Sequence, residues 1–291
     1  MFQSLCYYLL MEYYSPLRFP GGKNNLYNFI YSVILDNRLL NGCYVEPYAG
    51  GAAIALRLLM ENICEKVYIN DISKPIYAFW YSVLNFNDYL CQMIEDTDIT
   101  IDEWHRQRNI FFNQEKESIL ELGFATFFLN RTNFSGILQA GVLGGKKQNS
   151  RYKVDSRFKK QNLIPRIRQI KKFADRIILS RKDALIFLNE KARKLPEKTL
   201  IYLDPPYYYK GKKLYENYYG EKNHRDIANF LTKNIDLFWL VSYDNADEII
   251  DMYKNIEYQR YNLRYTANRF KNGNEIMFFS PALEQQEISI I

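Results

Sequence analysis

The sequence predicts an α/β fold, in which a mostly parallel sheet carries helices on both faces and ends in an antiparallel hairpin. Short apolar runs alternate with stretches of helical periodicity, and this alternation is typical of parallel sheets. The apolar runs that we expect to be strands span residues 44–46, 67–70, 177–179, 200–203, 237–242 and 275–279. The last run pairs with residues 257–265 around Asn272 and Gly273, a dipeptide typical of tight turns, so these two segments are predicted to form the hairpin at the sheet edge.

Residues 86–172 interrupt the alternation. Their sequence is first helical and then rich in Gly and Lys, so we expect them to form an inserted lobe. The flanking parts of the chain, residues 1–85 and 173–291, are then expected to form one domain around the sheet. A chain of 291 residues is long enough for one large core with such an insertion.

The most informative stretch is Asp204-Pro205-Pro206-Tyr207, which follows the apolar run 200–203. Two successive prolines fix φ at about −65° and remove two backbone donors, so the turn is rigid. It presents a carboxylate, a carbonyl and an aromatic face, which suit a planar base with an exocyclic amino group. Asp204 and the carbonyl of Pro205 would accept the amino hydrogens, and Tyr207 would stack on the ring. The alternative is a structural turn in which Asp204 only satisfies nearby amides.

A glycine loop lies between the predicted strand 44–46 and the helical run 52–60. Gly50 and Gly51 let the backbone approach a ligand closely, beside the amides of a helix N-terminus. The next strand ends in Asp71, where doubly wound folds place an acid that holds ribose hydroxyls. Asp71 could instead, or in addition, cap the helical segment that follows it.

With these motifs the chain resembles the DNA adenine methylase (Dam-type) family of S-adenosylmethionine-dependent, adenine-specific DNA methyltransferases. The resemblance covers nearly the whole chain and includes the order of the motifs. They are an opening motif at 15–23, the glycine loop at 47–51, the acid Asp71, a DNA-recognition motif at 130–136 and the catalytic tetrapeptide at 204–207. The resemblance implies a Rossmann-like methyltransferase fold: a doubly wound sheet with an antiparallel edge hairpin and an inserted, mainly helical DNA-recognition lobe.

The resemblance also implies residue roles and the cofactor S-adenosylmethionine. The catalytic residues would be Asp204, Pro205, Pro206 and Tyr207. The cofactor-binding residues would be Phe19, Lys23, Pro47, Tyr48, Ala49, Gly50, Asp71, Asp183 and Asp204. Phe19 stands where many relatives have Trp, and Gly51 followed by two alanines departs from the commonest form of the loop. For Asp183 the alternative is the N-cap of a helix over 184–194.

The charge distribution predicts double-stranded DNA as a partner. Residues 131–172 contain twelve cations and one acid, a net charge of +11, and because the whole chain carries +6 the remainder carries −5. So biased a segment fits phosphate neutralisation around DNA, although a solvated basic face is the alternative. The predicted DNA-binding residues are Arg18, Arg131, Asn133, Lys146, Lys147, Arg151 and Lys160. By resemblance, Arg18 would reach a base of the recognition site.

Other function classes find little support in the sequence. The cysteines at 6, 43, 64 and 91 show no CxxC spacing and there are two histidines, so neither a metal nor a disulfide framework is expected. None of these cysteines follows a proline, so the Pro-Cys nucleophile of cytosine ring-carbon methyltransferases is missing. The apolar stretch 1–11 is short and lacks a basic leader, which predicts no membrane partner and a cytoplasmic location. Met11 is a candidate start.

The predicted reaction is site-specific methyl transfer from S-adenosylmethionine to the exocyclic amino group of an adenine flipped out of double-stranded DNA. Residues 208–220 are a candidate lid over the flipped base, or else a surface loop. A cognate restriction endonuclease is a candidate second partner. The alternatives left open are an RNA adenine or DNA cytosine-amino methyltransferase and a catalytically silent DNA-binding relative.

Overall fold

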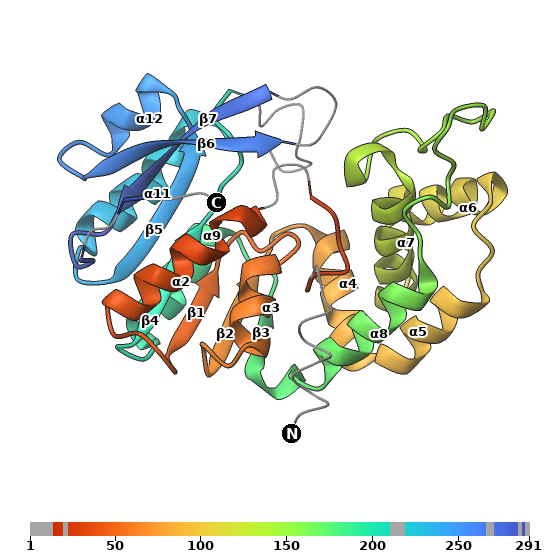
Figure 1. The fold of residues 1–291 in the computed structure, drawn as a ribbon, viewed down its shortest axis with the longest axis horizontal. Coiled ribbons are helices and arrows are strands. Elements are labelled where there is room, and N and C mark those ends of the chain that lie inside the picture. Colours follow the sequence, from red (N-terminus) through yellow and green to blue (C-terminus); the bar gives the residue numbers. More distant parts are fainter. Residues whose placement is uncertain (1–13, 20–22, 210–218, 266–270, 285–286, 289–291) are drawn as a thin grey trace.

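A computed structural model of the chain describes residues 14–19, 23–209, 219–265, 271–284 and 287–288. Its central feature is a seven-stranded sheet with the order β3-β2-β1-β4-β5-β7-β6 (Figure 1). The strands are β1 (Cys43–Glu46), β2 (Lys66–Asn70), β3 (Ile177–Ser180), β4 (Thr199–Leu203), β5 (Phe238–Asp244), β6 (Tyr258–Tyr265) and β7 (Lys271–Phe279). β1 to β5 run parallel, and β7 pairs antiparallel with both β5 and β6. The predicted α/β fold with an antiparallel edge hairpin is confirmed.

The turn predicted for that hairpin is wrong. Asn272 and Gly273 do not form the turn, because they pair with Arg264 and Leu263 inside the β6–β7 ladder. The connection between the strands falls in residues 266–270, which lie outside the described residues. An Asn-Gly dipeptide favours a tight turn only where strand register allows one, and here the long pairing of β6 with β7 sets the register.

Side chains alternate between the two faces of the sheet, as the period of a strand requires. In β4, Leu200 and Tyr202 pack into the core on one face, whereas Ile201 and Leu203 pack into the core on the other. The first core is covered by α2 (Tyr27–Asp36), α3 (Ala53–Met60) and α4 (Lys74–Asn85), and the second by α9 (Ala184–Lys191), α11 (Glu221–Lys233) and α12 (Asp247–Met252). The sheet is therefore doubly wound, with helices on both faces.

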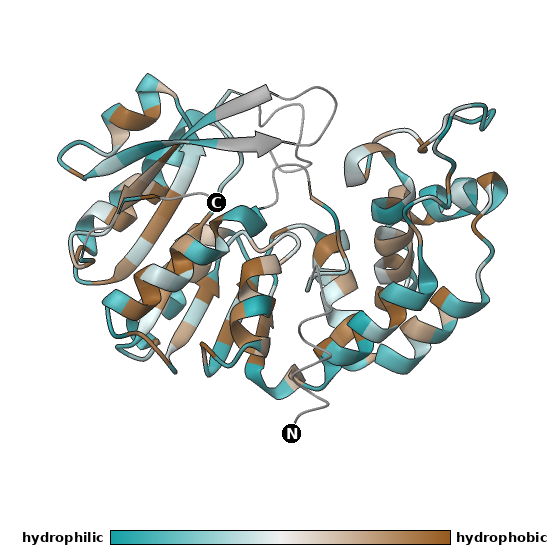
Figure 2. Cartoon of the chain, viewed as in Figure 1, coloured by the Kyte–Doolittle hydropathy of each residue, from teal (hydrophilic) through white to brown (hydrophobic). Residues whose placement is uncertain are grey.

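The inserted lobe lies to one side of the sheet and is mainly helical, as predicted (Figure 1). It contains α5 (Asn87–Asp96), α6 (Ile101–Phe112), α7 (Ile119–Thr132), η2 (Phe134–Gly136) and α8 (Lys160–Lys171). The remaining short helices are η1 (Lys23–Leu26), η3 (Ala174–Arg176) and η4 (Ala192–Lys194). Between η2 and α8 a segment projects from the lobe, and Figure 2 shows that it is largely hydrophilic.

The lobe and the sheet share one hydrophobic core through α4. The ring of Phe79 in α4 stacks on Phe127 in α7 at 5.7 Å between centroids, and Phe158 packs edge-on against Phe127 at 5.3 Å. These residues belong to the same cluster as the side chains under α2 and α3. The division of the chain into a lobe over residues 86–172 and a domain formed by the remainder therefore stays a prediction about function. It does not correspond to two separate hydrophobic cores. Within the described residues, no helix is long and apolar enough to cross a membrane.

Asn70, at the end of β2, ties together the loops that follow three strands. Its side chain is fully buried. The amide nitrogen donates to the carbonyls of Pro47 and Lys182 at 3.0 and 2.9 Å. The amide oxygen accepts from the Ser180 hydroxyl and the Lys182 N–H at 2.8 and 3.0 Å. Because buried polar groups must be paired, this one amide fixes the relative positions of those loops.

We predict that Asn70→Ala lowers the free energy of unfolding by about 2–4 kcal/mol, because it leaves several buried groups without their partner. Urea denaturation of the two proteins measures this change. Asn85→Ala is the matched control, since Asn85 is exposed and its side chain makes one hydrogen bond to Tyr81. The control should stay within about 0.5 kcal/mol of the wild type, and an equal loss in both variants would contradict the role of Asn70.

Candidate functional site

The predicted motifs meet at the carboxyl ends of the parallel strands. Asp204 follows β4 and Asp71 follows β2, with β1 and its glycine loop between them. The strand order reverses between β1 and β4, and ligands of doubly wound sheets bind outside the strand ends at such a reversal. The fold thus brings together residues that are more than 130 positions apart in the sequence.

The glycine loop packs against an aromatic ring from the N-terminal segment. Gly50 has φ +45°, and a Cβ placed on it would lie 3.2 Å from a ring carbon of Phe19. A Cβ on Gly51 would lie 3.1 Å from the same ring. The Gly50 carbonyl accepts from the Trp80 indole N–H at 2.8 Å, which anchors the loop to α4. The two glycines are therefore needed for the close approach of Phe19 to the loop backbone.

Asp71 lies directly beside this loop. One carboxylate oxygen accepts from the Gly50 N–H at 2.9 Å, and the other accepts from the Ser73 N–H at 2.9 Å. The N-cap of α4 is Ser73, whose hydroxyl accepts from the Ile76 N–H. The alternative role of Asp71 as the cap of this helix is thus wrong, because the helix begins three residues later, at Lys74.

Asp183 is the N-cap of α9, as the alternative reading of the sequence proposed. Its Oδ1 accepts from the N–H groups of Leu185 and Ile186 at 2.9 and 3.3 Å. Its Oδ2 accepts from the Tyr219 hydroxyl at 3.2 Å, and that hydroxyl accepts from the Tyr48 hydroxyl at 3.2 Å. Asp183 and the glycine loop are therefore linked through Tyr219, which lies near the end of the candidate lid and was given no role of its own by the sequence.

Asp204 lies in a cluster of charged groups. Its Oδ1 accepts from the Ser242 hydroxyl at 3.1 Å and lies 3.4 Å from the ammonium of Lys23. The same ammonium donates to Glu275 at 2.6 Å and to the Tyr207 hydroxyl at 3.2 Å. Lys23 and Glu275 are almost fully buried, whereas the Asp204 side chain keeps 26% of its surface exposed. Asp204 is thus the member of the cluster that a substrate can reach.

This environment changes the proton affinity of the carboxylates. Burial raises the pKa of Asp204 to about 6, although the nearby Lys23 ammonium opposes the shift and Glu275 adds to it. Burial also raises the pKa of Glu46, at the end of β1, to about 8. Burial lowers the pKa of Lys23, but the attraction of Asp204 and Glu275 outweighs it and the net shift is upward. Lys23 is therefore charged at neutral pH.

Two of these acids were missed by sequence reasoning. Glu46 accepts from the Ala55 N–H in the first turn of α3 at 3.2 Å, so it supports the helix that follows the glycine loop. Glu275 accepts hydrogen bonds from Tyr207, Tyr261 and Lys23. Each acid stands at one end of a short apolar run of the sequence, Glu46 in 44–46 and Glu275 in 275–279. An acid at such a position was the available signal, because buried acids need partners.

The Tyr207 hydroxyl takes part in the same cluster, since it donates to Glu275. Its side chain is buried, with 8% of its surface exposed. Pro205 is buried and Pro206 is partly exposed, so the tetrapeptide forms a packed turn. The loop beyond it is held at its start, because the N–H groups of Tyr208 and Tyr209 donate to Asp244 at 2.8 and 3.2 Å. Most of the candidate lid, residues 210–218, lies outside the described residues.

Arg18 lies where the N-terminal segment meets the lobe. Its N–H donates to the Asn130 side chain at 2.7 Å, and Asn130 donates back to the Arg18 carbonyl at 2.7 Å. One guanidinium nitrogen, Nη1, is buried and has no hydrogen-bond partner among the described residues. Burial lowers the pKa of Arg18, and the neighbouring Arg157 lowers it further. A buried guanidinium nitrogen without a partner favours an anion or a hydrogen-bond acceptor at this position.

Arg131 belongs to the same group of arginines. It donates to the carbonyls of Arg157 and Pro16 at 2.8 and 3.4 Å. Burial lowers its pKa to about 9, and repulsion from Arg18, Arg166 and Arg157 adds to the shift. Several like charges that lie this close destabilise one another unless an anion joins them.

The other predicted DNA-binding residues differ in their surroundings. Lys146, Lys147 and Arg151 are exposed on the projecting segment. Asn133 is fully buried, accepts from the Trp104 indole at 2.7 Å and donates to the carbonyls of residues 137 and 138, so its contacts are structural. Lys160 donates to the carbonyl of Glu95 at 2.5 Å, a contact between α8 and α5.

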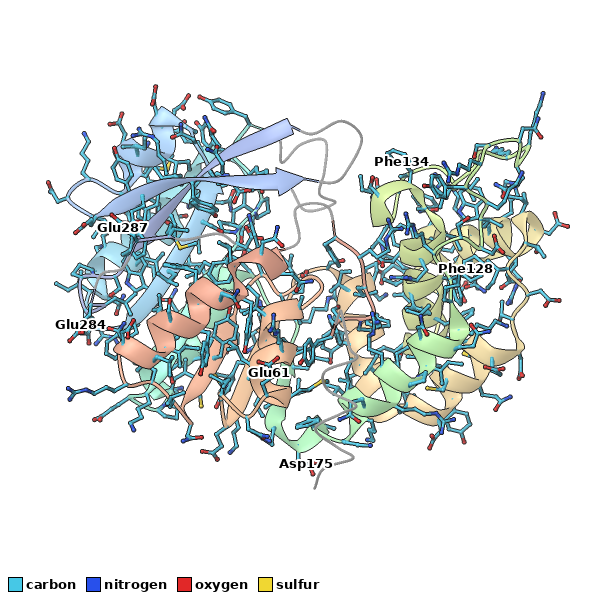
Figure 3. All side chains as sticks on the ribbon, in the orientation of Figure 1. Glu61, Phe128, Phe134, Asp175, Glu284 and Glu287 are labelled. Atoms are coloured by element: carbon cyan, nitrogen blue, oxygen red, sulfur yellow. The ribbon has the colours of Figure 1, made fainter. Side chains whose placement is uncertain are left out.

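Aromatic side chains of the lobe lie both inside it and on its surface. Figure 3 shows Phe128 within the lobe and Phe134 at its end, where 46% of the Phe134 surface is exposed. The guanidinium groups of Arg151 and Arg157 both lie near the exposed ring of Tyr152, at 5.7 and 5.6 Å from its centroid. Over the described part of the chain, no group of three or more His, Cys, Asp or Glu residues could hold a metal ion.

Comparison with known proteins identifies the family of the chain. Residues 19–276 match the model of the D12 class N6 adenine-specific DNA methyltransferases. The chain is also 28% identical over 211 residues to the Type II methyltransferase M.MjaIII of Methanocaldococcus jannaschii, an alignment that covers 68% of this chain and 70% of that protein. The family match spans the glycine loop, Asp71 and the 204–207 tetrapeptide. The chain therefore belongs to the D12 class of N6 adenine-specific DNA methyltransferases, as the resemblance of its motifs indicated.

Proposed function

We propose that this protein methylates an adenine flipped out of double-stranded DNA, with Asp204 and Pro205 orienting the amine and S-adenosylmethionine bound at the glycine loop. Family membership makes it an adenine-specific DNA methyltransferase and implies S-adenosylmethionine in general. It also decides against the alternatives of an RNA or a cytosine-amino substrate. The proposal adds the individual residues and their roles.

The observation that carries the proposal is the environment of Asp204. Among the described residues, the contacts to its carboxylate, from Ser242 and Lys23, are both made to Oδ1. Oδ2 is therefore the oxygen that can accept a hydrogen from the amine. An aryl amine is a poor nucleophile because its lone pair is delocalised into the ring. Two acceptors, Oδ2 of Asp204 and the carbonyl of Pro205, would draw the nitrogen towards tetrahedral geometry and aim its lone pair.

The residues around the glycine loop fit a nucleoside cofactor. Asp71 stands at the end of β2 beside the glycine loop, where its carboxylate accepts from the Gly50 and Ser73 N–H groups, and doubly wound folds place at this strand end the acid that holds ribose hydroxyls. Phe19 supplies an aromatic ring beside the loop, and Tyr48 of the loop is linked to Asp183 through the Tyr219 hydroxyl. When bound, S-adenosylmethionine would supply a methyl group activated by its sulfonium, so no metal is required.

The arginine group supports DNA as the substrate that the lobe binds. Arg18 has an unpaired guanidinium nitrogen, and Arg131 lies among like charges. A base edge or a phosphate would supply the missing acceptor and the missing negative charge. We further propose Lys146, Lys147 and Arg151 as phosphate contacts, because these charged side chains are exposed and can reach DNA without a rearrangement of the lobe. A cytoplasmic location and a cognate restriction endonuclease stay predictions from the sequence.

The first prediction for the activity is that expression of the chain in a host without DNA methylation places N6-methyladenine at one sequence motif. Asp204→Ala should abolish the modification and leave DNA affinity within about threefold, because its carboxylate acts on the amine and not on phosphates. Modified-base sequencing and a DNA-binding titration measure the two effects. Asp226→Ala, at a partly exposed acid of α11 that pairs with Lys222, is the control. More than about a tenth of wild-type methylation by Asp204→Ala would remove Asp204 from the reaction.

Asp71→Ala is predicted to weaken S-adenosylmethionine binding by about 1–3 kcal/mol, because a charged acceptor for the ribose hydroxyls is lost. Titration calorimetry of the folded variant measures the affinity. Asp71→Asn keeps one acceptor oxygen for the Gly50 amide and should lose less. DNA affinity should not change in either variant. An unchanged cofactor affinity in Asp71→Ala would exclude Asp71 from the site.

DNA affinity is predicted to fall linearly with salt on logarithmic axes, with a slope of about −0.9 for each phosphate contacted. Lys146→Ala and Lys147→Ala should each reduce the steepness by about one contact and weaken all sequences alike. Arg18→Ala should lose about 1–3 kcal/mol on the preferred site only. Titrations over a salt series, on specific and scrambled duplexes, measure both effects. Lys66→Ala, at the amino end of β2, is the control. If both lysine variants show the same salt slope as the control, the proposed phosphate contacts of Lys146 and Lys147 are wrong.

A further inference from the structure

We propose that Glu275 is a positioning residue for methyl transfer: it holds Lys23 and Tyr207 so that Asp204 keeps one carboxylate oxygen for the adenine amine. The inference rests on the role proposed above for Asp204. It concerns a residue of β7 that lies 71 positions beyond Asp204 in the sequence and outside every motif considered at the outset.

Glu275 joins Tyr207, Lys23 and Tyr261, which belong to separate parts of the chain. Oε1 accepts from the Tyr207 hydroxyl, which belongs to the turn after β4. Oε2 accepts from the Lys23 ammonium at 2.6 Å and from the Tyr261 hydroxyl of β6 at 2.7 Å. The Glu275 side chain is 2% exposed. A buried carboxylate is tolerated only with such partners, so Glu275 is held in one position and holds its partners in turn.

The two distances from the Lys23 ammonium indicate what this arrangement does. The ammonium lies 2.6 Å from Glu275 and 3.4 Å from Asp204, so its closer ion pair is with Glu275. Without Glu275 the ammonium would be left to pair with Asp204 alone. A tight ion pair would draw negative charge away from the oxygen that must accept the amine hydrogen. Glu275 therefore keeps Lys23 near Asp204 without letting it neutralise that carboxylate.

The competing explanation is that Glu275 contributes only to folding. Its effect on the charge of Asp204 distinguishes a positioning role from that explanation. The groups that act on Asp204 are Lys23, Glu275 and Ser242, with the buried Glu46, Tyr202 and Tyr261 also nearby. Together they raise the pKa of Asp204 to about 6, because the upward shift from burial and from Glu275 outweighs the lowering by Lys23 and Ser242. Removing the charge of Glu275 takes away one cause of the upward shift and strengthens the attraction of Lys23. Both changes lower the pKa of Asp204.

We predict that Glu275→Gln lowers the single-turnover rate of methyl transfer by about tenfold or more, with S-adenosylmethionine and DNA affinities within about threefold of wild type. The wild-type rate should fall as the pH drops through about 6, because Asp204 must be ionised to accept the amine hydrogen. This fall is the acid limb of the pH–rate profile. In Glu275→Gln the acid limb should move to lower pH by about one unit. Rapid-quench assays over a pH series measure the rate and the limb.

Glu61→Gln is the matched control, because Glu61 has a similar set of partners. It accepts from the hydroxyls of Tyr14 and Tyr27 and from the Arg57 guanidinium. It follows the last residue of α3 and so lies at the end of that helix opposite the glycine loop (Figure 3). Glu61→Gln should lower thermal stability and leave the acid limb unchanged. An equal movement of the limb in both variants would overturn the inference.

Glu275→Asp keeps the charge and shortens the side chain, so it provides the test should Glu275→Gln fail to fold. Its acid limb should stay near that of the wild type while its rate falls, because the shorter chain cannot hold Lys23 and Tyr207 together. A wild-type rate and limb in the folded Glu275 variants would overturn the inference. Asp204→Ala belongs in the same assay. If it stays active, the role of Asp204 itself fails, whereas an inactive Asp204→Ala beside an unaltered Glu275→Gln removes only the role of Glu275.

Discussion

The buried ammonium of Lys23 is shared between Asp204 and Glu275, and the geometry of the site depends on this one interaction. Lys23 begins η1 near the N-terminal motif, Asp204 follows β4 and Glu275 lies in β7, so the contact joins the start, the middle and the end of the chain. A buried charge must be paired, and its partners here are the carboxylate proposed to act on the amine and the carboxylate proposed to support it. The constraint explains why an edge hairpin contributes to a site at the ends of the parallel strands.

A second constraint joins the lobe to the glycine loop. The segment 14–19 lies between the sheet and the lobe in Figure 1. The backbone of Arg18 exchanges two hydrogen bonds with the side-chain amide of Asn130 in α7, and the adjacent Phe19 packs on the backbone of Gly50 and Gly51. The same few residues therefore contact both the lobe proposed to bind DNA and the loop proposed to bind the cofactor. Because the lobe also shares a core with the sheet through α4, the two parts are held in one arrangement.

Some residues combine a structural contact with a proposed functional one. Asp71 holds the Gly50 amide, and Asp183 caps α9 and accepts from Tyr219. For such residues the sequence alternatives of ligand or structural group were not exclusive, since a carboxylate has enough acceptor sites for both. Asn133 differs, because its amide is fully buried and engaged with Trp104 and the backbone of its own loop. Its place in a DNA-recognition motif is explained by the shape of the loop that it fixes.

The sequence by itself determined the fold class and the family. It also indicated that the glycine loop, Asp71 and the 204–207 tetrapeptide follow strands β1, β2 and β4. Strand patterns have a local period and the motifs are contiguous, so neighbours in the sequence carry both signals. It could not determine the turn between β6 and β7, where the pairing of long strands overrode the preference of Asn272 and Gly273. Nor could it find Glu275, the Tyr48–Tyr219–Asp183 chain or the neighbours of Arg18, because their meaning lies in contacts between distant segments. Only the tertiary structure decided which charges are buried together, since burial and pairing depend on the whole fold.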